Sequence, residues 1–152
     1  MDAPTKDLPE LEQLLCFAVY STGFAFNRVY RRPLQRLGLT YPQFLVMVAL
    51  WGEDGVTVGR LGERLSLDTS TLTPLLKRLE TMGHLSRRRS DEDERRVLVA
   101  LTDKGRALRQ EAGDVFRCIT AAAGMPLADI VRLTDELRTL RSKLEKAAAA
   151  TE

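Results

Sequence analysis

Apolar positions between residues 68 and 81 recur at the spacing of an amphipathic helix. The leucines at positions 72, 75, 76 and 79 follow the i, i+3, i+4, i+7 rule and lie within about 100° of arc. Because proline breaks a helix interior, Pro74 favours a helix that starts close to Ser70. The opposite face carries hydroxyls and cations: Ser70, Thr73, Pro74, Lys77 and Thr81, flanked by Thr71 and Arg78. Such a face suits either solvent or the major groove of DNA.

Two shorter helices are predicted ahead of this one. Thr40 and Gln43 have the spacing of a capping box, which would begin a helix over residues 42–51. Thr57 can cap a further helix over residues 58–65. Three helices in this order, joined by short turns, predict a helix-turn-helix lobe.

A basic hairpin follows the 68–81 helix. Residues 85–89 and 96–101 are expected to form two short strands, with residues 90–95 as the turn between them. We interpret the hairpin as the wing of a winged helix-turn-helix that occupies residues 40–101.

The two ends of the chain predict helices whose apolar faces need a partner. The first helix is expected to run from residues 7–9 to about Tyr30, with Pro33 and Gly38 ending it, and residues 14–20 are apolar on nearly all sides. A fifth helix is expected from a Thr102 cap to about Thr120. A last helix after residues 124–126 carries a seam with steps of three and four: Ile130, Leu133, Leu137, Leu140 and Leu144.

These elements predict one domain spanning residues 1–152 that forms a homodimer. Residues 8–38 and 103–150 are interpreted as dimerisation helices that flank the lobe of residues 40–101. The expected fold class is mainly α (α+β), a winged helix-turn-helix with N- and C-terminal dimerisation helices.

Basic residues are concentrated in one part of the chain. Residues 77–109 hold ten Lys or Arg against six Asp or Glu, although the net charge of all 152 residues is only +2. A concentrated basic stripe is typical of nucleic-acid binding. A solvated charged surface would explain the same composition, and the hairpin pattern is what favours DNA.

Composition also argues against membrane and metal chemistry. No apolar run approaches the roughly 20 residues of a membrane span, and the first residues lack the apolar core of a signal peptide. We therefore expect a cytoplasmic protein with no membrane partner. Two cysteines and a single His84 give no zinc-ligand spacing, so we expect no metal and no cofactor.

Candidate DNA contacts lie on the 68–81 helix and on the hairpin. The candidates for base edges are Thr69, Ser70, Thr71 and Thr73. The candidates for phosphates are Lys77, Arg78, Arg87, Arg88 and Arg89. Arg95 is expected in a narrow minor groove, with its guanidinium oriented by a bidentate pair to Asp93. A two-fold dimer would place two such helices about 34 Å apart, so the operator should be a near-palindrome.

Several segments resemble a known family of regulators. Residues 93–95 (DER), followed by residues 97–102 (VLVALT) and Gly105, resemble the wing-to-helix signature of the multiple-antibiotic-resistance regulator (MarR) family. Three further segments are similar to the organic hydroperoxide resistance regulators (OhrR type) within it: residues 14–20 (LLCFAVY), 39–45 (LTYPQFL) and 72–78 (LTPLLKR). The resemblance covers roughly residues 10–145. One departure is Ser70, where relatives commonly carry Gly.

The resemblance implies a redox switch. Cys16 matches the peroxidatic cysteine, and Tyr30 and Tyr41 match tyrosines that hydrogen-bond it from the partner subunit. Cys118 matches the resolving cysteine of the two-cysteine subgroup. Oxidation of Cys16 by an organic hydroperoxide, followed by an intersubunit disulfide to Cys118, would then release operator DNA from a repressor.

The residues themselves limit how such a thiol could be activated. Thiolate, not thiol, attacks a peroxide, and no Lys or Arg adjoins Cys16 in the sequence, so donors across space must stabilise it. Tyr20 lies one turn away on the same face. Tyr30 follows Cys16 by about 21 Å along a straight helix, so it could reach the thiol only across an antiparallel dimer pair.

Three other interpretations stay open from the sequence. A regulator of the same fold could bind a small aromatic acid between the dimer helices and the DNA lobe, with inert cysteines. A thiol peroxidase would need an activating charge near Cys16, and the single His84 leaves no catalytic triad, so we do not expect an enzyme. A purely architectural DNA binder would respond to no small molecule.

Overall fold

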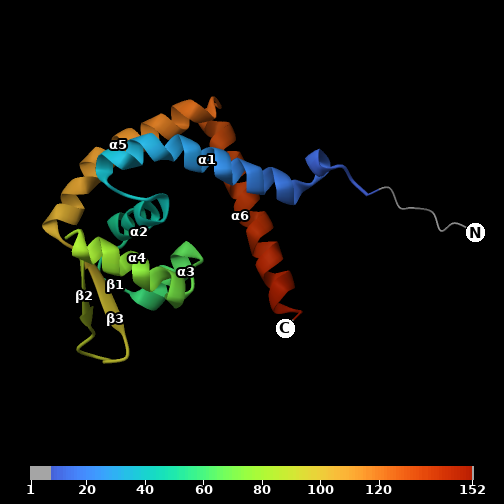
Figure 1. Ribbon diagram of the computed structural model, residues 1–152. Helices are drawn as coiled ribbons and strands as arrows, with labels where there is room; N and C mark the ends of the chain where they lie inside the picture. The colour runs from blue at the N-terminus through green and yellow to red at the C-terminus, as the bar shows by residue number, and fades with distance from the viewer. Residues whose placement is uncertain (1–7, 152) are drawn as a thin grey trace, which may run out of the picture. The chain divides into compact units, whose positions relative to one another are not determined.

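The computed structural model describes residues 8–151 (Figure 1). A short 3-10 turn, η1 (Leu11–Gln13), precedes the main elements. In chain order these are α1 (Leu15–Leu37), α2 (Tyr41–Gly52), β1 (Val56–Thr57), α3 (Val58–Leu65), α4 (Thr69–Thr81), β2 (Leu85–Arg89), β3 (Val97–Leu101), α5 (Asp103–Ala123) and α6 (Leu127–Ala149). The fold divides within α5 into two compact units, residues 1–115 and 116–152.

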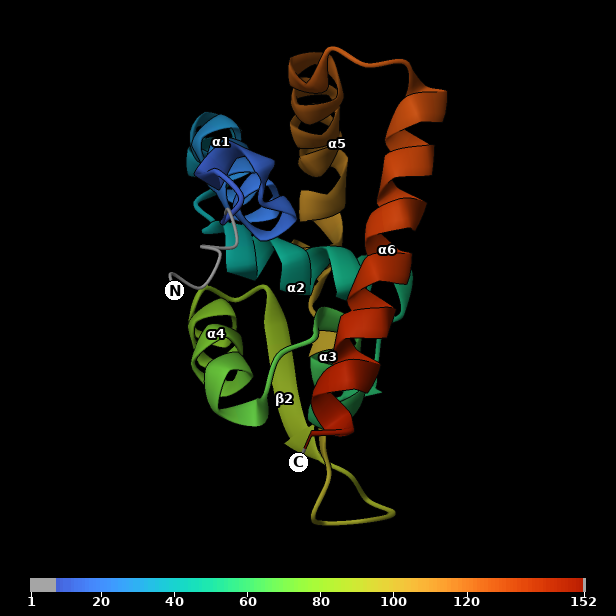
Figure 2. The same cartoon turned by 90° about the vertical axis from the view of Figure 1, so that its right-hand side faces the viewer.

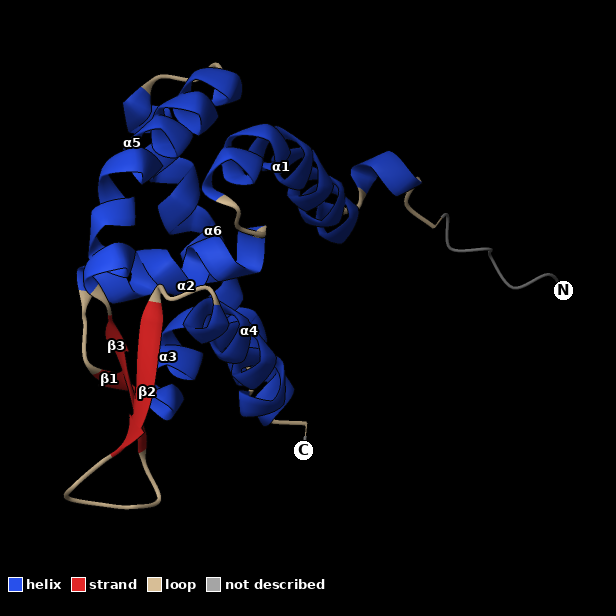
Figure 3. Cartoon of the chain, turned by 60° about the vertical axis from the view of Figure 1, so that its left-hand side comes forward, coloured by secondary structure: helices blue, strands red, loops and turns tan. Residues whose placement is uncertain are grey.

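The three strands form one antiparallel sheet in the order β1-β3-β2. Leu85 pairs with Leu101 and Arg89 with Val97, while Val56 of β1 pairs with Val99 on the other side of β3. Figure 3 shows the β2–β3 hairpin, whose loop extends away from α2 and α4. The expected strand at 85–89 is confirmed, and β3 begins one residue later than expected. Sequence did not predict β1, because two residues are too few to show a strand pattern.

The core of the first unit lies between α2, α3, α4 and the sheet. Figure 2 shows α2 between α1 on one side and α3 and α4 on the other. Leu72, Leu76 and Leu79 of α4 are at most 1% exposed, which confirms its predicted apolar face. The largest fully buried side chains are Phe44, Met47, Leu50, Leu61, Leu72, Leu76, Leu79, Leu85, Val46, Val99 and Val115. Helix α2 is therefore the central element on which the other helices of the unit pack.

Polar caps set where the helices of the lobe begin. The Thr40 hydroxyl accepts the Gln43 N–H, and the Gln43 side chain accepts the Thr40 N–H at 2.9 Å, so the predicted capping box is confirmed. Thr57 accepts the Arg60 N–H at 3.1 Å at the start of α3, also as predicted. Asp68 caps α4, which therefore begins at Thr69, earlier than the expected start near Ser70.

Helix α1 differs from its predicted bounds at both ends. It starts at Leu15, after a separate 3-10 turn, and it continues past Tyr30 and through Pro33 to Leu37. Leu34 is 2% exposed and Tyr30 packs against the core, so tertiary contacts hold the turns around Pro33. Gly38 ends the helix in the left-handed region at φ 68°, as predicted. Of the predicted start at residues 7–9, residue 7 lies outside the described residues, and residues 8–10 belong to no helix or strand.

The second unit consists of the end of α5 and the whole of α6. Helix α5 continues to Ala123, three residues beyond the expected end near Thr120, and Pro126 precedes the first turn of α6. The predicted seam of α6 has little cover within the chain, since Leu133, Leu137 and Leu144 are 44%, 43% and 61% exposed. Across residues 8–151, no helix is long and apolar enough to cross a membrane.

The turn between α4 and β2 holds the chain's single histidine. His84 is 4% exposed, and its Nδ1 has no hydrogen-bond partner among the described residues. Burial lowers the pKa of His84, and the nearby Lys104 charge lowers it further. The backbone around it is held tightly, because the Thr102 hydroxyl donates to the Gly83 carbonyl at 2.6 Å and Gly105 packs against the His84 carbonyl. Protonation of this imidazole would therefore place a charge in a packed site.

We expect His84→Leu to reduce the acid sensitivity of folding. Because the pKa of His84 is lowered in the folded protein, the unfolded chain binds a proton more readily. The free energy of unfolding should thus fall as pH drops below the ordinary value of 6.5, until the lowered pKa is passed. Urea unfolding at pH 7.5 and 5.5 measures the effect. An equal loss of stability in the wild type and the variant would contradict it.

Candidate nucleic-acid interface and thiol site

The outer face of α4 presents four exposed hydroxyl side chains at its N-terminal end: Thr69, Ser70, Thr71 and Thr73. Ser70 donates its hydroxyl proton to Asp68 at 2.6 Å, and Thr73 donates to the Thr69 carbonyl at 2.7 Å. The oxygens of these two hydroxyls remain accessible as acceptors. The Ser70 hydroxyl, and then Thr71, lower the pKa of the Asp68 carboxyl, so this cap stays ionised.

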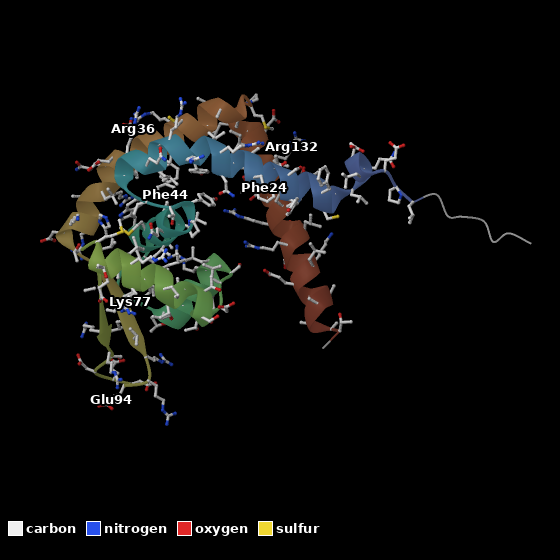
Figure 4. All side chains as sticks on the ribbon, in the orientation of Figure 1. Phe24, Arg36, Phe44, Lys77, Glu94 and Arg132 are labelled. Atoms are coloured by element: carbon white, nitrogen blue, oxygen red, sulfur yellow. The ribbon has the colours of Figure 1, made fainter. Side chains whose placement is uncertain are left out.

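Cations follow the hydroxyls along α4 and onto the hairpin. Lys77 and Arg78 are exposed on the next turns of α4, and Figure 4 shows Lys77 on the side of α4 that leads toward the hairpin. Within residues 8–151, the side chains of Lys77, Arg78, Arg89 and Arg95 form no ion pair. Their charge is therefore available to an external anion.

Arg87 is held differently from its neighbours on β2. Its backbone N–H, Nε and Nη2 all donate to the Glu80 carboxylate, at 2.9, 3.1 and 2.8 Å. These contacts lower the pKa of Glu80, with the Arg87 side-chain hydrogen bond as the largest cause. The pair joins the last turn of α4 to the first strand of the hairpin. Arg88 pairs with Asp91 at 3.2 Å, which leaves Arg89 as the unpaired cation of the 87–89 run.

The expected bidentate pair between Asp93 and the Arg95 guanidinium is wrong. Asp93 accepts the backbone N–H of Arg95 at 3.0 Å, and its second oxygen lies 3.5 Å from Nε of Arg96. The carboxylate is used to shape the turn, because a short Asp side chain reaches the backbone two residues on more easily than a distant guanidinium. The Arg95 guanidinium is therefore not held by Asp93, and Arg95 follows Glu94, which Figure 4 labels on the hairpin loop.

A groove of about 580 Å³ lies between α3, α4 and the hairpin. Its polar lining combines four cations and three hydroxyls with one carboxylate: Arg60, Arg87, Arg95, Arg96, Thr57, Thr69, Thr73 and Glu63. This groove and the outer face of α4 form one basic, hydroxyl-rich surface of the first unit. The sequence analysis did not identify Glu80 as part of this surface. Glu80 and Arg87 are seven positions apart across a turn from helix to strand, and no helix or strand periodicity predicts a contact at that spacing.

Cys16 lies in the first turn of α1 and Cys118 in α5, and both thiols are free and exposed. The apolar residues 14–20 are left largely uncovered within one chain, since Leu15, Val19 and Tyr20 are 61%, 46% and 64% exposed. Among residues 8–151, no group of three or more His, Cys, Asp or Glu side chains is placed to hold a metal ion.

Tyr30 and Tyr41 come together across the α1–α2 turn. Their ring centroids are 4.6 Å apart, and the Tyr30 ring lies 6.0 Å from Phe44. Burial raises the pKa of both phenols, and for Tyr30 the neighbouring Tyr41 raises it further. Both therefore stay protonated and can donate hydrogen bonds. Tyr30 follows Cys16 in one continuous helix, about 21 Å along its axis, so the fold joins the tyrosines to each other without the thiol.

Known transcriptional regulators are similar to this chain in sequence and fold. The family profile described as "Transcriptional regulator SarA/Rot" matches residues 28–112, more than half of the chain. The chain belongs to this family. It is 45% identical to the HTH-type transcriptional regulator TtmR of Methylorubrum extorquens over 153 aligned positions, covering 100% of this chain and 78% of TtmR. The organic hydroperoxide resistance transcriptional regulator of Bacillus subtilis is 39% identical over 140 residues, covering 92% of this chain and 95% of that protein.

Solved structures show the same fold on DNA. Reduced AbfR bound to DNA matches with a TM-score of 0.73 at 34% identity, over 88% of this chain and 94% of that chain. Disulfide-formed AbfR matches with a TM-score of 0.63 at 35% identity, over 86% and 91%. AbfR is a protein of Staphylococcus epidermidis. This SarA/Rot family member is therefore a DNA-binding transcriptional regulator, not an enzyme, and the predicted MarR-type winged-helix fold is confirmed.

We expect Glu80→Gln to loosen the hairpin and destabilise the first unit by about 1 kcal/mol, because the neutral amide loses the charge-assisted bonds to Arg87. Since the pKa of Glu80 is lowered, its contribution is present above the ordinary value of 4.5 and disappears as pH falls through the lowered pKa. Thermal unfolding at pH 7 and pH 3 measures both effects.

The matched control is Glu94→Gln, at an exposed position on the hairpin tip. It removes the same charge and should change stability by less than about 0.5 kcal/mol. Equal melting temperatures for the two variants at pH 7 would refute a stabilising role for the Glu80–Arg87 pair.

Proposed function

We propose that this regulator is a homodimeric repressor that senses organic hydroperoxides through Cys16 and then releases its operator. The observation that carries the proposal is the separation of an exposed cysteine from a pair of phenols by the length of α1 between them. An exposed cysteine stands at one end, and two protonated phenols stand together about 21 Å further on. A relative of 39% identity that is named for organic hydroperoxide resistance supports this assignment.

A second copy of the chain would complete the site. The start of α1 exposes apolar side chains, including Val19, Tyr20 and Phe24, and α6 exposes its leucine seam. Uncovered apolar faces of this length are typical of dimerisation helices. An antiparallel pairing of two α1 helices would bring Cys16 of each subunit to the tyrosine pair of the other. The same two-fold axis would set two α4 helices about 34 Å apart on a near-palindromic operator.

Helix α4 and the hairpin would divide their contacts between the DNA bases and the DNA phosphate backbone. We assign the base edges to the α4 hydroxyls Thr69, Ser70, Thr71 and Thr73. Phosphate contacts fall to Lys77, Arg78, Arg88 and Arg89, while Arg87 supports the hairpin through Glu80. Arg95 would enter the minor groove of the DNA. Asp93 would stabilise the hairpin turn that carries Arg95, by accepting the Arg95 backbone N–H.

The chemical switch would proceed in two balanced steps. The Cys16 thiolate attacks the peroxide O–O bond, which gives a sulfenic acid on Cys16 and releases the alcohol once the leaving alkoxide takes a proton. The thiol of Cys118 in the other subunit then attacks the sulfenic sulfur, forming an S–S bond and releasing water. A conformation that accepts this bond but fits DNA less well would be favoured after oxidation, which lowers operator affinity.

We expect Arg95→Ala to weaken operator binding by about 1–3 kcal/mol and to flatten the salt dependence by roughly one unit, since one cation leaves the DNA. Binding is measured at several salt concentrations on a duplex selected from a random pool by the wild-type protein. Glu94→Ala, on the same tip, is the control and should leave the salt slope unchanged. If operator affinity and its salt dependence are unaltered in Arg95→Ala, the hairpin tip does not contact DNA.

We expect Cys16→Ser to keep operator binding and lose the response to hydroperoxide, because the attacking thiolate is absent. The measurement is release of the selected duplex by wild type and variant after treatment with cumene hydroperoxide. Release by Cys16→Ser would refute the sensing role and favour a regulator that binds its effector without covalent chemistry.

Cys118→Ser separates the second step from the first. On a non-reducing gel, mild peroxide should convert the wild type to a band of two chains, and this band should be missing in Cys118→Ser. A two-chain band that persists without Cys118 would contradict the assignment of the resolving cysteine.

A further inference from the structure

Helix α1 carries positive charge that nothing within the described chain neutralises. Its sequence from Leu15 to Leu37 contains four arginines and no acidic residue: Arg28, Arg31, Arg32 and Arg36. None of the four forms an ion pair with residues 8–151, whereas arginines of α3, the hairpin and α6 pair with nearby carboxylates. An arginine stripe of this kind is available to an anion from outside the chain.

One of these arginines lines the pocket that holds the two phenols. This pocket of about 390 Å³ lies between the second half of α1 and the start of α2. Asn27, Tyr30, Arg31 and Leu34 follow the i, i+3, i+4, i+7 spacing, so they share the helix face that borders it. The other three arginines are not part of its lining. Arg31 is therefore the cation of the pocket, and Arg32 is an exposed neighbour outside it.

The pocket offers an anion both hydrogen bonds and charge. Its titratable lining groups are Tyr30 and Arg31 from α1 and Tyr41 from α2; the other lining residues are uncharged. The phenols can donate hydrogen bonds, but neutral groups cannot compensate a full negative charge. A guanidinium remains charged at every physiological pH and fits both roles.

The thiol lacks such compensation on its own helix. Residues 11–27, which surround Cys16 in sequence, contain Glu12 and neither Lys nor Arg. A thiolate there would meet a carboxylate and no cationic side chain, and only the partial positive charge of the α1 N-terminus would favour it. A full positive charge beside the thiolate would therefore come from the surface against which Cys16 docks.

We propose that Arg31 supplies this charge, holding Cys16 of the partner subunit as a thiolate when it enters the pocket beside Tyr30 and Tyr41. The inference rests on the proposed function and on the antiparallel pairing of two α1 helices. Each subunit would then carry the thiol for one site and the cation with both phenols for the other, so an isolated chain would hold two incomplete halves. Arg31 becomes the determinant of how fast the sensor reacts.

The experiment measures the ionisation of Cys16 directly. In a Cys118→Ser background Cys16 is the sole thiol, because the chain has two cysteines. The rate of alkylation by iodoacetamide is followed from pH 5 to 9 in the intact dimer, with Arg31→Gln compared with Arg32→Gln. An opposite charge within about 4–6 Å moves a pKa by one unit or more, so alkylation at pH 6 should fall about tenfold in Arg31→Gln. Arg32→Gln, with the same charge loss one residue away, should match the parent.

Arg31→Lys provides the rescue, since an ammonium restores the charge and should recover most of the alkylation rate. Thermal unfolding and light scattering of each variant establish that the dimer persists. If Arg31→Gln does not dimerise, the alkylation rates of Arg31→Lys and Arg31→Met are compared instead. These two variants again differ in whether the side chain at position 31 is charged.

Two results would overturn the inference, and a third would overturn the proposed function on which it rests. Identical pH profiles for Arg31→Gln and Arg32→Gln would show that Arg31 has no special role. A loss of operator affinity in reduced Arg31→Gln, with an unchanged thiol profile, would assign the residue to a DNA phosphate instead. Full hydroperoxide-driven release by Cys16→Ser would instead refute the proposed function, and the alkylation profiles keep these two failures distinct.

Discussion

The burial of three leucines on one face of α4 against the α2 core is the contact on which the candidate DNA-binding surface depends. Leu72, Leu76 and Leu79 are almost completely removed from solvent, and each such side chain contributes about 2 kcal/mol. Their spacing fixes the rotation of α4 about its own axis. The hydroxyls and cations at the intervening positions must then face outward. The chemistry offered to DNA is thus a consequence of apolar packing on the other side of the helix.

A set of polar contacts fixes the hairpin and the first turn of α5 to this core. Glu80 binds Arg87 through three hydrogen bonds at the base of the hairpin. Asp54 accepts the Leu101 N–H at 2.8 Å and pairs with Arg106 at 3.0 Å, while Trp51 donates to the Gly105 carbonyl at 2.9 Å. Most of these partners are partly buried, where a lost bond leaves an unsatisfied group. These contacts therefore keep the hairpin in register with α4.

The proposed thiol site has the opposite character, because one chain supplies only separated parts of it. Rigid helix geometry keeps Cys16 away from Tyr30, and the aromatic contact between Tyr30 and Tyr41 anchors the phenols to the α1–α2 turn. Phe44 contacts Tyr30 and Trp51 in turn, so the phenols adjoin the aromatic core of α2. A site that needs two subunits is sensitive to their arrangement, which is a suitable property for a switch that acts on dimer geometry.

Sequence alone determined the elements whose signals are local. The apolar face of α4, the capping box of Thr40 and Gln43, the Thr57 cap and the β2 strand all follow from neighbouring residues, since helix and strand periods and caps involve only a few positions. The candidate residues of the proposed thiol site come from the resemblance to a known family and stay predictions. Tertiary structure alone decided the rest: α1 continuing through Pro33, the short β1, the Glu80–Arg87 pair and the turn role of Asp93. Each of these rests on contacts or on a choice between competing hydrogen-bond partners, and a one-dimensional pattern carries no record of which partner is nearer in space.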